Sequence, residues 1–246
     1  MAAGDFSAQA EAYARARPGY PLELVRELAR AAGVRPGHAV ADVGAGTGIF
    51  AGILAELGFA VTAIEPNAAM RARVPHIAGV TVHAGTFEAT GLADGSQRWV
   101  TAAQAFHWAD PPRALPEMRR VLAPGGALTV LWNDRENERS PALAFVAAAI
   151  RRAVPGWDEA YRGADWSALL RSSGDFTRVV TAECRHAVTM SRARFLDLWQ
   201  SHNRLMEAAG PELFAALLAE IAAFLDGERI DAIDVPYVCR AWTATS

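Results

Sequence analysis

The sequence predicts an α/β protein built on a doubly wound, mostly parallel sheet with a helical cap. Short apolar runs alternate with segments of helical periodicity, as in repeated strand–helix units. A glycine-rich turn follows the first run, and an acidic residue ends the second. The strand-like runs occupy residues 39–43, 59–64, 80–83, 99–103, 127–132, 179–188 and 233–242.

The first strand is predicted to end in a ligand-binding turn. Residues 39–43 form an apolar run typical of a strand buried on both faces. Residues 49–57 continue with apolar side chains at helical spacing, and Gly58 stands where a helix C-terminal glycine is expected. Between them, a ligand can closely approach a backbone that lacks Cβ atoms at Gly44, Gly46 and Gly48.

The second strand adds an acid beside this turn. Residues 59–64 form another buried-strand run, and Glu65 follows 17 residues after Gly48. In a strand–helix–strand unit, an acid at this position can accept hydrogen bonds from both ribose hydroxyls. Each feature also has a simpler interpretation. Glu65 could cap the helix that opens at Pro66-Asn67. Glycine turns also occur where a chain merely reverses its direction. The two features together predict a nucleoside-type ligand.

Glycine spacing distinguishes between possible nucleosides. A dinucleotide site requires G-x-G-x-x-G, whereas this chain has G-x-G-x-G followed by Ile49. A nicotinamide-dependent oxidoreductase therefore remains an alternative that Ile49 disfavours. The pattern, with Asp42 two residues before the first glycine, resembles motif I of the class I S-adenosylmethionine-dependent methyltransferases.

The resemblance extends over residues 6–133. It looks most like the small-molecule branch that includes trans-aconitate methyltransferase-like proteins, and it is carried by residues 13–21, 65–70, 104–108 and 120–126. It is weaker beyond, near 178–190 and 228–243. The resemblance implies a Rossmann-like, seven-stranded sheet with an antiparallel last strand. One departure is at the start of the fourth strand, where the family usually has Asp and this chain has Gln97-Arg98-Trp99.

The resemblance implies S-adenosyl-L-methionine as cofactor and S-adenosyl-L-homocysteine as product. The N-terminal segment would cover the cofactor, with Arg17 pairing with its methionine carboxylate unless Arg17 is a solvated helix residue. Thr86 would hydrogen-bond the adenine, and Phe87 would pack on it unless Phe87 is ordinary core. The expected cofactor contacts are Tyr13, Arg17, Asp42, Gly44, Ala45, Gly46, Gly48, Glu65, Pro66, Met70, Thr86, Phe87, Gln104 and Phe106.

The expected reaction is an in-line methyl transfer to a small-molecule acceptor. His107 is the candidate general base, because an imidazole titrates near neutral pH, although it could simply be packed within an aromatic wall. Ligands of doubly wound sheets bind at the carboxyl ends of the strands. The substrate-side candidates from that region are Trp108, Trp132, Asn133 and Arg135. A non-catalytic binding module is an alternative, since methyl transfer requires no diagnostic catalytic residue.

Length and composition predict one domain. The chain has 246 residues, of which 52% are hydrophobic, enough for one substantial core. We expect an N-terminal helical cap over 1–35, a cofactor-binding core over 36–135, and helical insertions with the last two strands over 136–246. Two cysteines indicate no disulfide framework, and no ligand spacing indicates a metal.

Charge and residue usage exclude several chemistries. All 24 basic residues are Arg, so a lysine Schiff base, a pyridoxal phosphate linkage and a Walker A lysine are impossible. The net charge of −3 and the scattered Arg disfavour nucleic acid. No apolar run is long enough to span a membrane, and no signal segment is evident. We expect a cytoplasmic monomer or homodimer.

The remaining segments are predicted to be mostly helical. Two helical pieces over residues 6–32 are interrupted at 17–21. Asp110 followed by Pro111 is typical of a helix start, and Pro116 is expected to kink or shorten that helix. Further helices are expected within 141–172 and over 195–205 and 213–225, the last two as a lid over the substrate.

Overall fold

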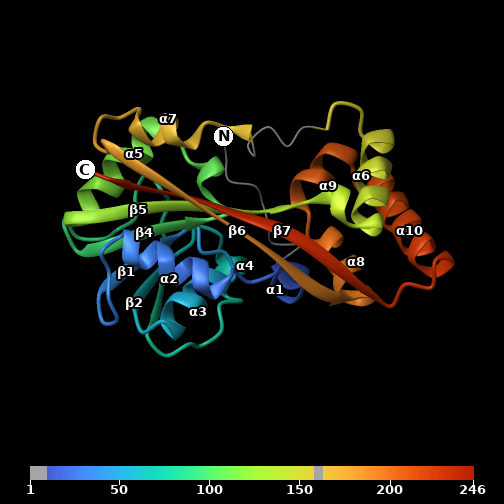
Figure 1. Cartoon of the computed structure of the whole chain (residues 1–246), viewed down its shortest axis with the longest axis horizontal. Helices are drawn as coiled ribbons and strands as arrows, with labels where there is room; N and C mark the ends of the chain where they lie inside the picture. Colours follow the sequence, from blue (N-terminus) through green and yellow to red (C-terminus); the bar gives the residue numbers. More distant parts are fainter. Residues whose placement is uncertain (1–9, 158–162) are drawn as a thin grey trace.

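A seven-stranded sheet organises the computed structural model, which describes residues 10–157 and 163–246. Its strand order is β3-β2-β1-β4-β5-β7-β6 (Figure 1). In this order, the first five strands, β3, β2, β1, β4 and β5, pair in parallel. Strand β7 lies between β5 and β6 and runs antiparallel to both. The strands are β1 Ala39–Val43, β2 Ala60–Ile64, β3 Val80–His83, β4 Gln97–Ala103, β5 Leu122–Arg135, β6 Arg178–Ser191 and β7 Ala232–Thr245. The predicted doubly wound sheet with an antiparallel last strand is confirmed.

Helices cover both faces of the sheet. The described helices are α1 Ala10–Ala16, α2 Leu22–Ala31, α3 Ile49–Glu56, α4 Ala68–Arg71, α5 Pro111–Val121, α6 Pro141–Ala153, α7 Trp166–Arg171, α8 Arg192–Gln200, α9 Asn203–Ala209 and α10 Pro211–Gly227, with short 3-10 turns at Phe106–Trp108 and Asn137–Arg139. No single helix in these described ranges is both long and apolar enough to cross a membrane.

Side-chain alternation along the central strands builds two cores. In β5, Ala127 and Leu131 face the cluster formed with α2 and α3. Leu128 and Val130 point to the opposite cluster, which contains α5 and α7. Successive side chains of a strand point to opposite faces, so strands covered on both sides are apolar throughout. Figure 1 shows these helices on the two sides of the sheet.

A third cluster forms where the last strands extend past the sheet. β6 and β7 each have 14 residues, far more than β1 or β2. Helices α6, α8, α9 and α10 gather around their extended halves (Figure 1, right) and share a buried apolar cluster with them. The N-terminal helix α1 packs against α8, so this cluster adjoins the carboxyl ends of the parallel strands.

Glycines set both ends of α3. Gly48 precedes the helix with a φ of 81°, and Gly58 follows it with a φ of 84°. The amide of Gly58 bonds the carbonyl of Ala55, and that of Phe59 bonds Leu54. This pair of bonds is the Schellman pattern of helix ends, and it confirms the predicted end of the helix at Gly58.

The single helix expected over 195–205 is wrong, because the chain breaks at Ser201 between α8 and α9. Arg17 Nη2 donates to the Ser201 carbonyl at 3.3 Å and Arg17 Nε to its hydroxyl at 3.1 Å. The Ser201 carbonyl thus accepts from Arg17, whereas in a continuous helix it would accept from the backbone amide four residues later. Pro116 does not shorten α5, which runs unbroken to Val121. Within 141–172, helix is present as α6 and α7, and residues 158–162 lie outside the described ranges.

The unusual start of the fourth strand coincides with a change of register. Pairing of β4 with β5 shifts between Gln97 and Trp99. The Trp99 side chain is fully buried, and its indole nitrogen donates to Thr129 Oγ1 at 2.8 Å. Thr129 Oγ1 lies 2.9 Å from Thr243 Oγ1 on β7. One buried hydroxyl therefore joins three strands.

We expect Thr129→Val to lower the free energy of unfolding by about 1–3 kcal/mol, because the buried Trp99 indole loses its acceptor. Thr243→Val keeps that indole bond and is expected to cost less. Urea denaturation monitored by circular dichroism measures both. Equal costs for the two variants would contradict this role for Thr129.

Candidate functional site

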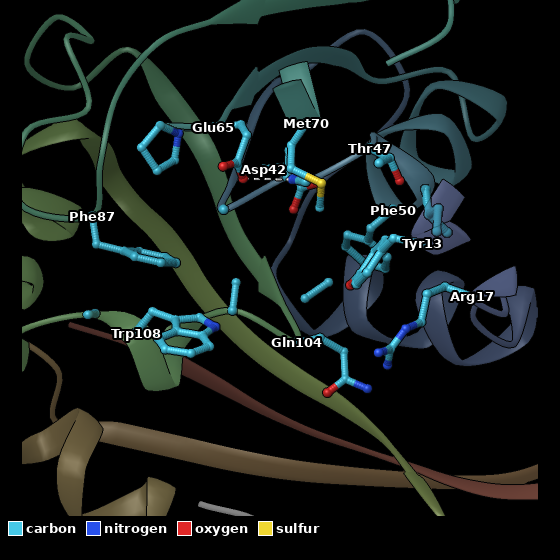
Figure 2. Close-up of a pocket in the computed structure, with 18 of the residues that line it drawn as sticks. Tyr13, Arg17, Asp42, Thr47, Phe50, Glu65, Met70, Phe87, Gln104 and Trp108 are labelled. Atoms are coloured by element: carbon cyan, nitrogen blue, oxygen red, sulfur yellow. Dashed lines mark hydrogen bonds between the residues drawn. The ribbon is translucent and has the colours of Figure 1, made fainter. Parts of the chain in front are cut away.

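A cavity of about 510 Å³ lies at the carboxyl ends of the parallel strands. The turns after β1, β2, β3 and β4 contribute to its wall, together with the end of β5, one residue of β7 and the N-terminal segment. In Figure 2, Tyr13 and Arg17 lie on one side, and Phe87 and Trp108 lie on the opposite side. This is where doubly wound sheets bind ligands, and the volume suits a small molecule.

The glycine turn is shaped by both packing and backbone conformation. Gly44, Gly46 and Gly48 have φ angles of 72°, 58° and 81°. A Cβ atom on Gly44 would lie 2.6 Å from Ala105 Cβ, and one on Gly48 would lie 2.7 Å from Val74 Cγ1. Gly46 meets nothing closer than 3.5 Å. Packing therefore requires glycine at 44 and 48, whereas at 46 the left-handed backbone requires it.

Glu65, at the end of β2, is hydrogen-bonded to this turn. Its Oε2 accepts from the Gly46 amide at 2.9 Å, and its Oε1 from the Asn67 amide at 2.8 Å. Burial raises the pKa of the Glu65 carboxyl, and the two amides oppose that shift. The side chain does not cap α4, because Asn67 Oδ1 accepts from the Met70 amide. Each Glu65 oxygen keeps acceptor capacity for a ligand.

Asp42 is buried beside Glu65. Its Oδ1 accepts from Thr101 Oγ1 at 2.9 Å, whereas Oδ2 has no partner at hydrogen-bonding distance among the described residues. Burial raises the Asp42 pKa to about 7; the Glu65 charge reinforces this rise, and the Thr101 hydroxyl and the Ala51 backbone oppose it. Asp42 also lines the cavity.

The N-terminal segment closes one side of the cavity. Arg17 lies over the Tyr13 ring, 4.7 Å from its centroid, and bonds Ser201 at the α8–α9 break. Tyr20 packs edge-on against Phe50 of α3, with ring centroids 4.9 Å apart. All of these residues except Ser201 line the cavity. The segment is thus held by contacts to α3 and to the distant α8–α9 region.

Sequence comparison identifies the fold carrying this site. Residues 41–130 match the family model described as a methyltransferase domain. Uncharacterized methyltransferases of Mycobacterium bovis and Mycobacterium tuberculosis are 43% identical over 135 residues, which is 53% of this chain and 53% of each relative. Over residues 41–130, the chain is therefore similar to methyltransferase domains. The aligned part spans about half the length of these relatives.

Solved methyltransferase structures share the architecture. A protein from Anaeromyxobacter dehalogenans, provisionally assigned as a type II methyltransferase, has a TM-score of 0.69 at 23% identity, covering 92% of this chain and 97% of its own. A provisionally assigned methyltransferase from an antibiotic biosynthesis pathway of Anabaena variabilis has a TM-score of 0.63 at 20% identity, covering 94% and 99%. At these identities the likeness shows the fold alone.

Most of the predicted methyltransferase site residues come together at the cavity. Those lining it are Tyr13, Arg17, Asp42, Gly44, Ala45, Gly46, Glu65, Pro66, Met70, Thr86, Phe87, Gln104, Trp108, Asn133 and Arg135. Gly48 begins α3 and does not line it. Phe106 and Trp132 are each 1% exposed and lie in the core, where both rings pack on Trp166.

His107 lines a second cavity of about 70 Å³ that shares Tyr13, Arg17 and Gln104 with the first. Its Nδ1 faces the Trp132 indole nitrogen, which donates at 3.4 Å. As the acceptor of this bond, Nδ1 carries no hydrogen. To accept a proton, His107 would use Nδ1 after giving up the Trp132 contact, or Nε2 after tautomer exchange.

The prediction from sequence omitted several residues that line the cavities. Tyr20 lies within the quoted 13–21 segment and Thr47 within the glycine turn, so local motifs could have included them. Glu88 follows Thr86 and Phe87, and Asp110 and Arg113 lie at the start of α5, so these three also lie beside predicted features. The long β7 strand and the break between α8 and α9 bring the other lining residues, which carry no local signal: Tyr237, His202, Asn203 and Arg204.

We expect the stability of the protein to depend on the Asp42 carboxyl. Its pKa rises from 3.8 to about 7 on folding. The folded state thus binds this proton more tightly than the unfolded chain, so the stabilisation is present at low pH and lost as pH rises toward about 7.

The expected loss is on the order of 4 kcal/mol, since one unit of pKa corresponds to about 1.4 kcal/mol. Asp42→Asn cannot ionise, so its denaturation profile from about pH 4 to 8 should lack this component. Parallel profiles for the two proteins would refute the raised pKa.

Proposed function

We propose that this chain binds S-adenosylmethionine in the large cavity and transfers its methyl group to a small-molecule acceptor by in-line displacement. One observation carries the proposal: the Glu65 carboxylate is hydrogen-bonded to the Gly46 amide at the wall of a ligand-sized cavity. That pairing brings a ribose-binding acid beside a glycine turn, as a nucleoside ligand requires. The match of residues 41–130 to a methyltransferase domain supports the choice of cofactor.

The cavity residues fit such a ligand from end to end. Glu65 would accept the ribose hydroxyls, because its oxygens are fixed by two amides and retain acceptor capacity. Thr86 and Phe87 would flank the adenine near Trp108. The unpartnered Oδ2 of Asp42 offers an acceptor for a polar or cationic group of the ligand.

The opposite side would receive the methionine moiety. Tyr13 and Arg17 lie there in Figure 2, across the cavity from Phe87. Arg17 uses Nε and Nη2 on Ser201, and a guanidinium has five donors, so it can hold a carboxylate without releasing α9. Gln104 would contact the ligand from the turn after β4.

The chemistry makes modest demands on the protein. When bound, the cofactor supplies a methyl group already activated on a sulfonium. The chain's own residues would align the acceptor and exclude water, with Trp108, Asn133 and Arg135 at its binding side. His107 would remove a proton where the acceptor carries one, in the adjoining small cavity.

We expect Glu65→Ala to weaken S-adenosylhomocysteine binding at least about tenfold, because hydrogen bonds to a charged group are lost. Glu65→Gln keeps one acceptor oxygen and should fall between this variant and the wild type. Glu56→Ala, the same change at an exposed position of α3, is the matched control. Isothermal titration measures the affinities.

The same titration tests the class of ligand. S-adenosylmethionine and S-adenosylhomocysteine should bind, and NAD should not. Tight NAD binding with no binding of either sulfur ligand would overturn the proposal. Release of S-adenosylhomocysteine with any member of a small-molecule acceptor panel separates an enzyme from a non-catalytic binding module.

A further inference from the structure

Asn133, at the end of β5, connects three parts of the site through three different atoms. Its Nδ2 donates to the Gly19 carbonyl at 3.0 Å, and its Oδ1 lies 3.1 Å from His186 Nε2. Its backbone carbonyl accepts from Gln104 Nε2 at 2.9 Å. The side chain is only 5% exposed. Its three hydrogen bonds are partly buried.

The Gly19 carbonyl determines which atoms donate and which accept in this series of hydrogen bonds. The Gly19 carbonyl can only accept, so the amide nitrogen of Asn133 must face it and the amide oxygen must face His186. His186 Nε2 therefore carries a hydrogen and donates. Burial lowers the pKa of His186, in keeping with a neutral ring. The result is a directional relay from His186 through Asn133 to Gly19.

His186 is itself held in place by the neighbouring strand. It lies opposite Tyr237 in the β6–β7 pair, and the two rings stack with centroids 5.4 Å apart. Tyr237 lines the cavity, whereas His186 does not. The His186 imidazole therefore reaches the site through its hydrogen bond to Asn133. Its ring stacks on Tyr237 within the β6–β7 pair.

The relay ends on the turn that closes the cavity. Gly19 lies between α1 and α2, among Arg17, Pro18 and Tyr20, all of which line the cavity. On its other side, this segment is held by helix α8, because Arg194 donates to the Ala16 carbonyl at 3.3 Å. Asn133 supplies the anchor from the sheet.

Gln104 depends on the same residue. It has a φ of 57°, uncommon for a residue with a Cβ atom, and its amide donates to the Leu131 carbonyl at 2.8 Å. The Asn133 carbonyl then orients its side-chain amide. A single residue thus sets the cap turn on one side of the ligand space and Gln104 on another.

We propose that His186 and Asn133 are positioning residues that latch the 17–21 turn against the end of β5, so that the cap and Gln104 are preorganised around the ligand. The inference rests on the proposed function for the identity of that ligand. Preorganised contacts strengthen binding because less conformational freedom is lost when the ligand binds.

Two substitutions separate the hydrogen bond from the ring packing. His186→Phe keeps a stacked ring and removes the Nε2 donor. His186→Gln loses the aromatic ring and retains an amide donor at similar reach. Cys184→Ala, two residues earlier on the same face of β6, is the matched control. Asn133→Asp, which presents an oxygen to the Gly19 carbonyl, tests the other half of the relay.

Hydrogen–deuterium exchange over residues 11–21 and titration with S-adenosylhomocysteine are the two readouts. We expect His186→Phe and Asn133→Asp to exchange faster there and to bind about fivefold more weakly or worse, as loss of one neutral hydrogen bond gives. His186→Gln and Cys184→Ala should resemble the wild type. Thermal unfolding confirms that each variant is folded.

The outcomes separate the two proposals. Unchanged exchange and affinity in folded His186→Phe and Asn133→Asp would overturn the latch while leaving the proposed function intact. Failure of His186→Gln to restore slow exchange would also overturn it, since the effect would then follow the aromatic ring. If the wild type binds no sulfur ligand but the exchange pattern follows this prediction, the latch stands and the proposed function fails.

Discussion

The site depends on the close approach of two turns at the carboxyl edge of the sheet. Gly44 after β1 lies so near Ala105 after β4 that a methyl group would overlap it. Glu65 after β2 then ties the same turn down through the Gly46 amide. Three neighbouring parallel strands thereby bring their ends to one point. The cavity exists because these turns are fixed against one another rather than against a ligand.

Burial shifts the pKa of both acids at this edge of the sheet. Asp42 and Glu65 are both removed from water, and burial raises the pKa of each. Two backbone amides oppose the rise for Glu65, and the Thr101 hydroxyl and the Ala51 backbone oppose it for Asp42. A carboxyl in such surroundings favours the uncharged form unless a positive group approaches. In its uncharged form, the Asp42 carboxyl can donate a hydrogen bond as well as accept one.

The distant end of the chain completes the site. The long β6 and β7 strands carry His186 and Tyr237 to the end of β5, and the break after α8 presents Ser201 to Arg17. The Arg17–Ser201 and Asn133–Gly19 contacts each cross more than 100 residues of sequence. The N-terminal cap is consequently held between the sheet and the helices around β6 and β7. This arrangement connects the C-terminal part to a site whose motifs all lie in the first 135 residues.

The sequence by itself determined the sheet, the glycine turn and the acid after β2, because strand periodicity and backbone conformation are local properties. Most of the predicted cavity lining came from the resemblance of its motifs to a methyltransferase family. Only the tertiary structure decided that Phe106 and Trp132 belong to the core, although they flank true lining residues. It also decided the break at Ser201 and the His186–Asn133–Gly19 relay. Each of these arises from contacts between segments far apart in the chain, which no local pattern encodes.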